Sequence, residues 1–269
     1  MKTLISGGCS FVLGNELRDY EAAICQSGNE NYFSPNTCAG LVAKHFNLEY
    51  TCTALGGSAN NAISRHVIDG IHGKFEPLVV IMWSFLERHE FRFAYQVSKN
   101  NHWHSVNMWD SEATESTMRE YFGKGALTEN EERILQGHLK RIEEIRRIGI
   151  YDFAKQWYKN VGIDACHVSY LALKELVFMQ NILQQMRIPY VFTFADTRLM
   201  DCLTNPSKWS EVTRMATLVD KTRCMLEPRV GFYDWAKYNK FPMGTTHPLE
   251  EAHIEFSKLL INFTESLYV

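Results

Sequence analysis

A serine in a glycine-rich turn and a histidine before the last predicted helix are the two side chains best suited to react together. Ser10 lies in segment 7–14, which starts with two glycines, follows a short apolar run and ends at Gly14. A strand, a tight turn and a helix start can present a nucleophile, because the first N–H groups of the helix can hold an anion. His247 stands in Thr246-His247-Pro248, where an imidazole could take the serine proton. The pair predicts nucleophilic chemistry on an acyl carbon.

A third turn lies between these two and offers hydrogen-bond donors. Gly57 follows a candidate strand, and Asn60 begins the next predicted helix. The family resemblance described below implies that the backbone N–H groups of Ser10 and Gly57, with the side-chain amide of Asn60, form an oxyanion hole. Asn61 is an alternative amide donor, and a helix cap is the alternative role for Asn60. Cys9 is a rival nucleophile, but Ser10 fits the turn better, and Cys9 is expected to be a small buried neighbour.

Four apolar segments are predicted to form the sheet that positions these turns. They are the N-terminal run to Ile5 and segments 48–55, 78–83 and 188–194, and a weak fifth strand is expected near 230–233. Segment 78–83 is apolar at every position, which is typical of a parallel strand covered on both faces. Helices are predicted over 37–46, 60–71, 165–187 and 248–267 from their apolar periodicity and end residues. Residues 87–163 exceed what one crossover needs, so they indicate a mainly helical insertion.

The expected architecture is therefore a single α/β domain over residues 1–269, with a three-layer, flavodoxin-like parallel sheet and the insertion at 87–163. Parallel α/β sheets bind ligands at the carboxyl ends of their strands, which is where Ser10 and the insertion would lie.

Composition excludes several classes of protein. The 269 residues are 45% apolar and carry a net charge of −3 without a basic stripe, which predicts a packed core and no nucleic-acid partner. No apolar run is long enough to span a membrane or to act as a signal peptide. The seven cysteines are scattered along the sequence and form neither a Cys-x-x-Cys pair nor a Cys/His zinc pattern. This indicates reduced thiols and a cytoplasmic protein. The oligomeric state is not predicted.

No cofactor is predicted. His102 and His104 flank Trp103, but no carboxylate stands at ligand spacing, so we expect no metal. The turn at Gly7 and Gly8 lacks the Gly-x-x-x-x-Gly-Lys pattern, which argues against a kinase or sulfotransferase that binds a nucleotide there.

The three turns together resemble the SGNH hydrolase (GDSL esterase/lipase) superfamily, in short blocks spread over the whole chain. Ser10 matches the nucleophile of that family, Gly57 the glycine of its oxyanion hole and His247 its base. The resemblance implies a serine hydrolase that cleaves an ester, with O-acyl or O-acetyl groups on a carbohydrate, lipid or other small molecule as the substrate class.

The chain departs from the pattern of the family in three places. Cys9 replaces its usual Asp, the third strand lacks its Gly-x-Asn-Asp ending, and Gly244 stands where its acid precedes the histidine. We expect Asp196, at the end of the fourth strand, to supply the acid, with Asp234 as a weaker candidate and a Ser–His dyad as the remaining possibility. If Asp196 only caps its turn, it would matter for stability instead.

Residues after the third strand are predicted to contact substrate. Trp83, Ser84 and Arg88 follow the most apolar run and would lie over the site. Arg88 would bind an anionic group, unless it pairs with Glu87 or Glu90.

The missing acid and the missing Asn-Asp block also suit an alternative function. A catalytically degenerate protein of the same fold would bind a ligand or join an assembly, for example one encoded by a phage or gene cluster, and could then be associated with a virion.

Overall fold

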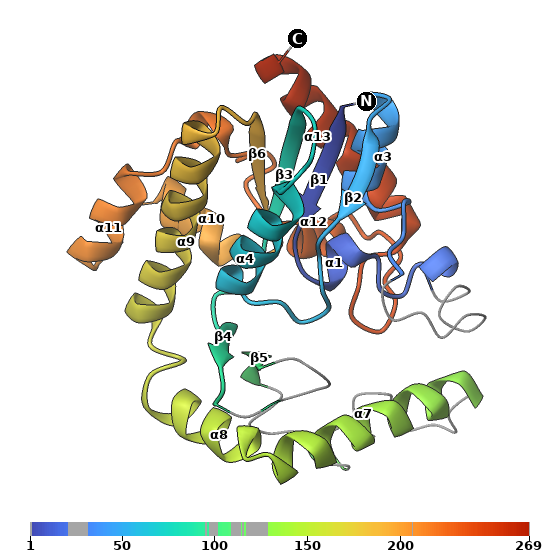
Figure 1. Cartoon of the computed structure of the whole chain (residues 1–269), viewed down its shortest axis with the longest axis vertical. Helices are drawn as coiled ribbons and strands as arrows, with labels where there is room; N and C mark the ends of the chain where they lie inside the picture. The colour runs from blue at the N-terminus through green and yellow to red at the C-terminus, as the bar shows by residue number, and fades with distance from the viewer. Residues whose placement is uncertain are drawn as a thin grey trace.

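The centre of the molecule is a four-stranded parallel sheet (Figure 1). The computed structural model describes residues 2–20, 32–94, 96, 102–108, 114, 116, 129–205 and 207–268. The strands are β1 (Thr3–Gly7), β2 (Glu49–Cys52), β3 (Pro77–Trp83) and β6 (Tyr190–Phe194), in the order β2-β1-β3-β6. The second, first, third and fourth strands of this sheet therefore lie side by side, which is the flavodoxin-like order. The predicted α/β class with a parallel sheet is confirmed.

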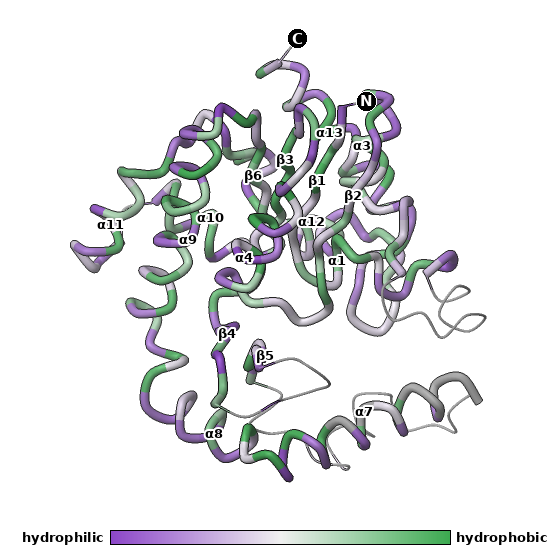
Figure 2. The backbone as a smooth tube through the Cα atoms, in the orientation of Figure 1, coloured by the Kyte–Doolittle hydropathy of each residue, from purple (hydrophilic) through white to green (hydrophobic). Residues whose placement is uncertain are grey.

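Helices cover both faces of this sheet and make three layers. One face carries α4 (Asn60–Ile71), α9 (Ala165–Gln185), α10 (Thr197–Thr204) and α11 (Ser210–Thr217). The other face carries α1 (Ser10–Leu13), α3 (Cys38–His45), α12 (Phe232–Tyr238) and α13 (Glu250–Tyr268). All five residues of β1 and all five of β6 are buried, which fits sequences in which apolar residues are interrupted only by the small Thr3, Ser6, Gly7 and Thr193. Figure 2 shows green, hydrophobic stretches along these central strands and along the helices that cover them.

Side-chain caps fix several of the helix boundaries. The side chain of Thr37 accepts a hydrogen bond from the N–H of Gly40 at the start of α3, and Asp164 does the same for His167 at the start of α9. Such caps satisfy donors that the first turn of a helix leaves free. The helix predicted over 60–71 is present with those bounds.

The expected fifth strand near 230–233 is wrong. Cys224 makes a single parallel bridge to Phe192 beside β6, directly after the short 3-10 helix η1 (Lys221–Arg223). Residues 232 and 233 instead begin α12, which packs its buried Phe232 and Trp235 against α13. The aromatic residues there are buried at a helix interface rather than on a strand.

Part of the predicted insertion is also visible. Its described residues form the antiparallel pair β4 (His89–Arg92) and β5 (Trp103–Val106), then α7 (Glu129–Arg147) and α8 (Ile150–Asn160). They lie beyond the carboxyl ends of the main strands (Figure 1). The segment thus contains a small sheet as well as helices, while segments 97–101, 109–113 and 117–128 lie outside the described residues. The single-domain boundary 1–269 stays a prediction.

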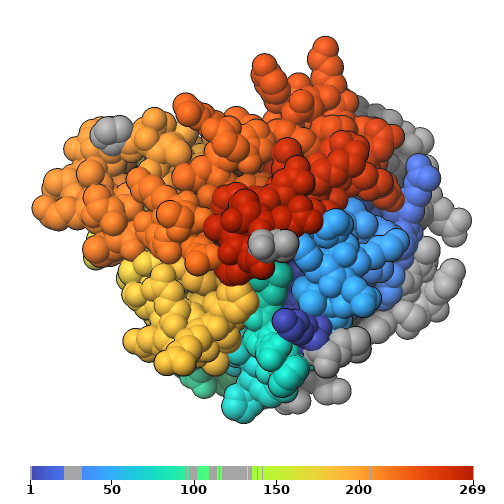
Figure 3. Space-filling view, turned by 90° about the horizontal axis from the view of Figure 1, so that it is seen from above, coloured from blue at the N-terminus to red at the C-terminus, as the bar shows by residue number. Residues whose placement is uncertain are grey.

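Figure 3 shows the opposite end of the sheet, where the first residues of β1 lie close to α13 and α3. Among the helices that the structure describes, none is both long and apolar enough to cross a membrane.

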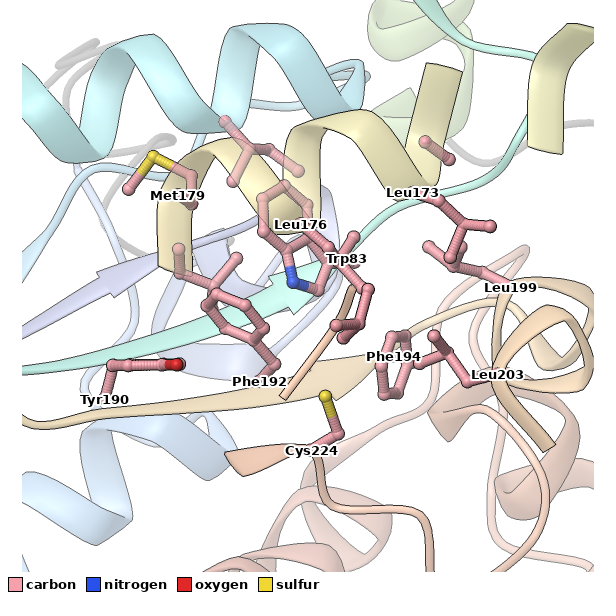
Figure 4. Close-up of a cluster of buried hydrophobic side chains, with 14 of the residues drawn as sticks. Trp83, Leu173, Leu176, Met179, Tyr190, Phe192, Phe194, Leu199, Leu203 and Cys224 are labelled. Atoms are coloured by element: carbon pink, nitrogen blue, oxygen red, sulfur yellow. The ribbon is translucent and has the colours of Figure 1, made fainter. Parts of the chain in front are cut away.

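A large hydrophobic cluster lies between β3, β6 and helix α9 (Figure 4). Trp83 is 0% exposed there, and its ring meets that of Phe192 edge to face at 5.3 Å. Leu176 and Phe194 complete its surroundings. Trp83 is therefore a core residue that holds α9 to the sheet.

We predict that Trp83→Ala lowers the free energy of unfolding by about 3–5 kcal/mol, because it leaves a large cavity in a packed core. Urea denaturation followed by circular dichroism measures this change. Tyr238, which is 84% exposed at the end of α12, is the matched aromatic control, and Tyr238→Ala should change stability by less than about 0.5 kcal/mol. Equal losses in the two variants would contradict the assignment of Trp83 to the core.

Candidate active site

Ser10 begins α1, immediately after β1 and a tight glycine turn. A Cβ at Gly7 would lie 2.3 Å from Cγ2 of Val67, and one at Gly8 would lie 2.4 Å from Cγ2 of Val12. The two glycines are thus needed for the close approach of the turn to α4 and α1. Ser10 is 6% exposed, whereas Cys9 is fully buried in the core, as expected for a neighbour that does not react.

His247 reaches Ser10 from the loop before α13. The distance between its Nε2 and the Oγ of Ser10 is 2.8 Å, so the proximity predicted for these two residues is present. The His247 ring stands edge to face against Phe11 at 5.3 Å. The N–H of Gly244 donates to the carbonyl of His247 at 2.8 Å, which ties this loop into a tight turn.

The other ring nitrogen of His247 is held by Glu16, a residue that our sequence prediction missed. Oε1 of Glu16 lies 2.9 Å from Nδ1 of His247. An ionised carboxylate can only accept, so Nδ1 donates its proton to Glu16 and Nε2 is left to accept the hydroxyl proton of Ser10. Ser10, His247 and Glu16 therefore have the connectivity of a catalytic triad.

Left-handed backbone conformations at Gly14 and at Glu16 itself bring the Glu16 side chain back towards Ser10. Gly14 ends α1 with φ 90°, and Glu16 itself has φ 68°, which is uncommon for a residue with a side chain. The N–H of Asn15 still donates to the carbonyl of Ser10 at 3.1 Å, so the chain reverses within a few residues. Thr246 secures the carboxylate, since its N–H lies 3.3 Å and its Oγ1 lies 3.2 Å from Oε1.

Gly244 explains why the acid comes from elsewhere in the chain. An ideal Cβ on Gly244 would lie 1.9 Å from Oε2 of Glu16. The carboxylate of Glu16 thus fills the space beside Gly244, the position at which the sequence pattern led us to expect an acid. A side chain at 244 and this placement of Glu16 exclude one another.

The electrostatics favour an ionised Glu16. Burial alone would raise its pKa, but the hydrogen bond and charge of His247 and the two hydrogen bonds from Thr246 outweigh burial, so the pKa lies below its usual value. A carboxylate that is ionised at neutral pH can hold the imidazole in one tautomer.

Asp196 lies at the carboxyl end of β6, as predicted, but it is not the acid that holds His247, because Nδ1 of His247 pairs with Glu16. Its carboxylate accepts hydrogen bonds from Arg198, with Oδ2 2.7 Å from Nη2, and from the N–H of Arg198 at the start of α10. Arg198 also pairs with Glu87. Asp234 accepts a short hydrogen bond from Thr197. Both predicted acids thus stabilise the turn after β6. The prediction that either one orients His247 is wrong, because Asp196 is bound by Arg198 and Asp234 by Thr197.

Three donors are available for an oxyanion hole. Within the described part of the chain, the N–H groups of Ser10 and Gly57 have no acceptor. Gly57 has φ 76° in the loop after β2, which is the neighbour of β1, so both loops leave the same edge of the sheet. Oδ1 of Asn60 accepts from the N–H of Ser84 at 2.7 Å, which leaves the Nδ2 donor of this buried amide unused by described residues. Asn61 is engaged instead with the backbone of Glu90.

The three residues predicted to contact substrate have different positions. The predicted contact of Trp83 with substrate is wrong, because its side chain is buried in the core and offers no surface to a ligand. Ser84 is also fully buried; its N–H holds Asn60 and its Oγ accepts from Nη1 of Arg88 at 3.0 Å. Arg88 is half-buried, and the structure gives it no carboxylate partner among the described residues. Of the three, Arg88 alone is accessible and keeps N–H donors that no described residue uses.

Metal ligands do not gather in this region. In the described ranges, no group of three or more His, Cys, Asp or Glu side chains is arranged to hold a metal ion. His102 lies beside the carbonyl of Phe93, at 3.2 Å from its Nδ1.

Comparison with known proteins gives little beyond a distant likeness of fold. Neither a protein-family model nor a curated protein matches the chain. A solved carbohydrate esterase, described as having an active site with divergent catalytic and non-catalytic binding functions, is 12% identical with a TM-score of 0.39. The alignment covers 99% of this chain, which spans 65% of the length of that esterase chain. A likeness of this size assigns neither a family nor an activity, so the function has to be argued from the site itself.

We predict that Glu16 titrates below about 4.3, the usual value for a glutamate. Carbon NMR of the labelled side-chain carboxyl, with Glu16→Gln to assign the resonance, measures this midpoint. A carboxyl whose pKa is lower in the folded than in the unfolded state stabilises the fold above the unfolded pKa, and that stability is lost as the pH falls through the folded pKa. A midpoint at or above the usual value would show that His247 and Thr246 do not hold the carboxylate.

Proposed function

We propose that this protein is a serine hydrolase that cleaves carboxylic esters, with Ser10 as the nucleophile, His247 as the general base and Glu16 as the acid that orients it. The observation that carries the proposal is the unbroken pair of hydrogen bonds, 2.8 Å from Ser10 to His247 and 2.9 Å from His247 to Glu16. A similar arrangement activates serine in unrelated hydrolase folds, so it is the geometry rather than the fold that supports this function. Membership of the SGNH superfamily belongs to the same proposal.

The first half-reaction transfers the acyl group to the enzyme. Oγ of Ser10 attacks the ester carbonyl carbon while Nε2 of His247 takes the hydroxyl proton, and Glu16 stabilises the resulting imidazolium. The carbonyl oxygen becomes an oxyanion that accepts from the N–H groups of Ser10 and Gly57 and from Nδ2 of Asn60. The carbon–oxygen bond to the alcohol then breaks, and His247 returns its proton to the departing oxygen. A water molecule repeats these steps on the acyl-enzyme and releases the acid.

Asn60 compensates for the missing block at the end of β3. The amide is anchored to the N–H of Ser84, the residue that directly follows β3, although Asn60 itself belongs to α4. An amide donor thereby stands at the carboxyl end of β3 without an asparagine in that strand's own loop. Glu16 likewise supplies an acid that position 244 lacks, so neither departure from the sequence pattern requires a degenerate, non-catalytic protein.

A fluorophosphonate probe should label the purified protein, and Ser10→Ala should abolish labelling, because the probe traps an activated serine. Cys9→Ser is the matched control one residue away and should retain most of the labelling. Hydrolysis of 4-nitrophenyl acetate should follow the same order. A folded wild-type protein that neither reacts nor hydrolyses this ester would point to the alternative of a binding or assembly protein.

Glu16→Gln should lower kcat by at least about a hundredfold, because loss of the orienting charge costs about 10⁴ in a serine protease triad. Asp196→Asn is the matched control: it should reduce thermal stability, since it breaks the ion pair with Arg198, and leave kcat nearly unchanged.

A double variant tests the exclusion between positions 16 and 244. Glu16→Ala with Gly244→Asp should recover part of the activity that Glu16→Ala loses, because the space vacated by Glu16 accommodates the new side chain. Gly244→Asp alone should be impaired, since it displaces Glu16.

If Asp196→Asn lowers kcat as strongly as Glu16→Gln does, the assignment of Glu16 is overturned.

A further inference from the structure

A cavity lies next to Asn60, on the side of the sheet that α4 and α9 cover. It has a volume of about 160 Å³ and is lined by residues of α4, β4, α8, α9 and the loop after β3. Figure 1 shows β4 and α8 at this end of the molecule, beyond the carboxyl ends of the strands. Asn60 lines this cavity and also belongs to the candidate oxyanion hole, so the cavity adjoins the candidate site at this residue.

Arg88 is a cation on the wall of this cavity, and no described carboxylate pairs with it. Its guanidinium lies 4.7 Å above the ring of Phe85, and Nη1 donates to Ser84. The acidic residues on either side have other partners: Glu87 pairs with Arg198, and Glu90 pairs with Arg65 at 2.6 Å. Stacking and one hydrogen bond fix the guanidinium, while its remaining N–H donors are unused by described residues.

The rest of the wall adds a second cation and unpaired polar atoms. Lys174 lines the cavity from α9 and forms no ion pair within the described part of the chain. Nε2 of His89 and Nε1 of Trp157 are buried without a hydrogen-bond partner, although both residues line the cavity. Both atoms are almost inaccessible to solvent even with the cavity empty, so the recognition of a ligand is assigned to the two cations rather than to them.

Two carboxylates limit the charge of such a ligand. Glu90 is neutralised by Arg65, whereas Glu175 accepts only from Ser64, and burial raises its pKa. A group with one negative charge would be attracted by Arg88 and Lys174 without strong repulsion from Glu175. A carboxylate carries this single charge at neutral pH, and its two oxygens match the planar fork of Arg88.

We infer that the cavity beside Asn60 binds a carboxylate of the substrate through Arg88, which makes the enzyme selective for esters of acidic molecules. Arg88 presents a planar fork of donors that matches a carboxylate, and Lys174 adds a more distant positive charge. The aromatic side chains of Phe91 and Trp157 form an apolar part of the wall that suits a ring carrying this carboxylate. The selectivity rests on the proposed ester hydrolysis at Ser10, whereas carboxylate binding in the cavity does not.

Matched probes that differ only in the carboxylate test the selectivity. The 2-O-acetyl esters of methyl glucuronide and methyl glucoside are compared as substrates. The wild-type protein should prefer the glucuronide ester by about tenfold or more in kcat/KM, mainly through a lower KM, as expected for hydrogen bonds to a charged group. Arg88→Met should reduce the ratio of the two kcat/KM values to about one, and Arg88→Lys should restore only part of it.

Arg92→Met is the control, because it removes the same charge from an exposed position of β4, four residues along the chain, and should retain the preference. A purely structural role for Arg88 would lower the melting temperature and both kcat/KM values together, without changing their ratio. An unchanged ratio in folded Arg88→Met overturns the inference, as does a wild-type protein without preference.

Binding measured without turnover separates this inference from the proposed hydrolysis. Calorimetry with Ser10→Ala should detect methyl glucuronide at least tenfold more tightly than methyl glucoside, and Arg88→Met should remove the difference. If fluorophosphonate labelling fails while this binding persists, the hydrolase proposal falls and the carboxylate site stands. If neither glycoside binds, or inorganic phosphate binds more tightly than methyl glucuronide, the carboxylate site is overturned.

Discussion

The hydrogen bond from His247 to Glu16 is the interaction on which the rest of the site depends. It joins the turn after β1 to the loop before α13, and it requires the left-handed conformations of Gly14 and Glu16 that reverse the chain after α1. A side chain at φ 68° has a cost, and the hydrogen bonds from His247 and Thr246 offset it. The same carboxylate fixes the tautomer of His247, which leaves Nε2 to accept from Ser10. One contact thus settles loop position, proton location and nucleophile orientation together.

The space that Glu16 fills shows how one geometry can arise from different positions in a chain. What the imidazole requires is an acceptor beside Nδ1, and the identity of the residue that supplies it matters less. Because Gly244 has no side chain, the carboxylate of Glu16 can enter from the opposite loop. Asn60 follows the same principle, since its anchor on Ser84 places an amide from α4 at the end of β3. The sheet fixes where the loops meet, and the groups they carry are partly interchangeable.

Much of the fold and part of the site followed from the sequence, for identifiable reasons. Strand β3 and helix α4 have strong periodicity and were placed well, and the turns around Ser10 and His247 are short patterns at sheet-edge positions. Glu16 was missed because its contact with His247 depends on its own left-handed backbone conformation. The sequence does not reveal a positive φ at a residue other than glycine. Asp196 does lie at the carboxyl end of β6, but position alone could not show that Arg198 neutralises it. Trp83 was misplaced because the last residue of a strand buried on both faces points into a helix layer rather than towards the loops.

The separation of Ser10 and His247 along the chain affects when the site can form. The two residues are 237 positions apart, and His247 is placed by the loop that leads into α13. At synthesis rates of about 5–20 residues per second, the serine leaves the ribosome roughly 10–50 s before its base does. During that interval the hydroxyl of Ser10 lacks the imidazole that the proposed mechanism requires as its proton acceptor. The proposed hydrolysis would therefore begin only when the loop before α13 is in place, which would make it a reporter of completed folding.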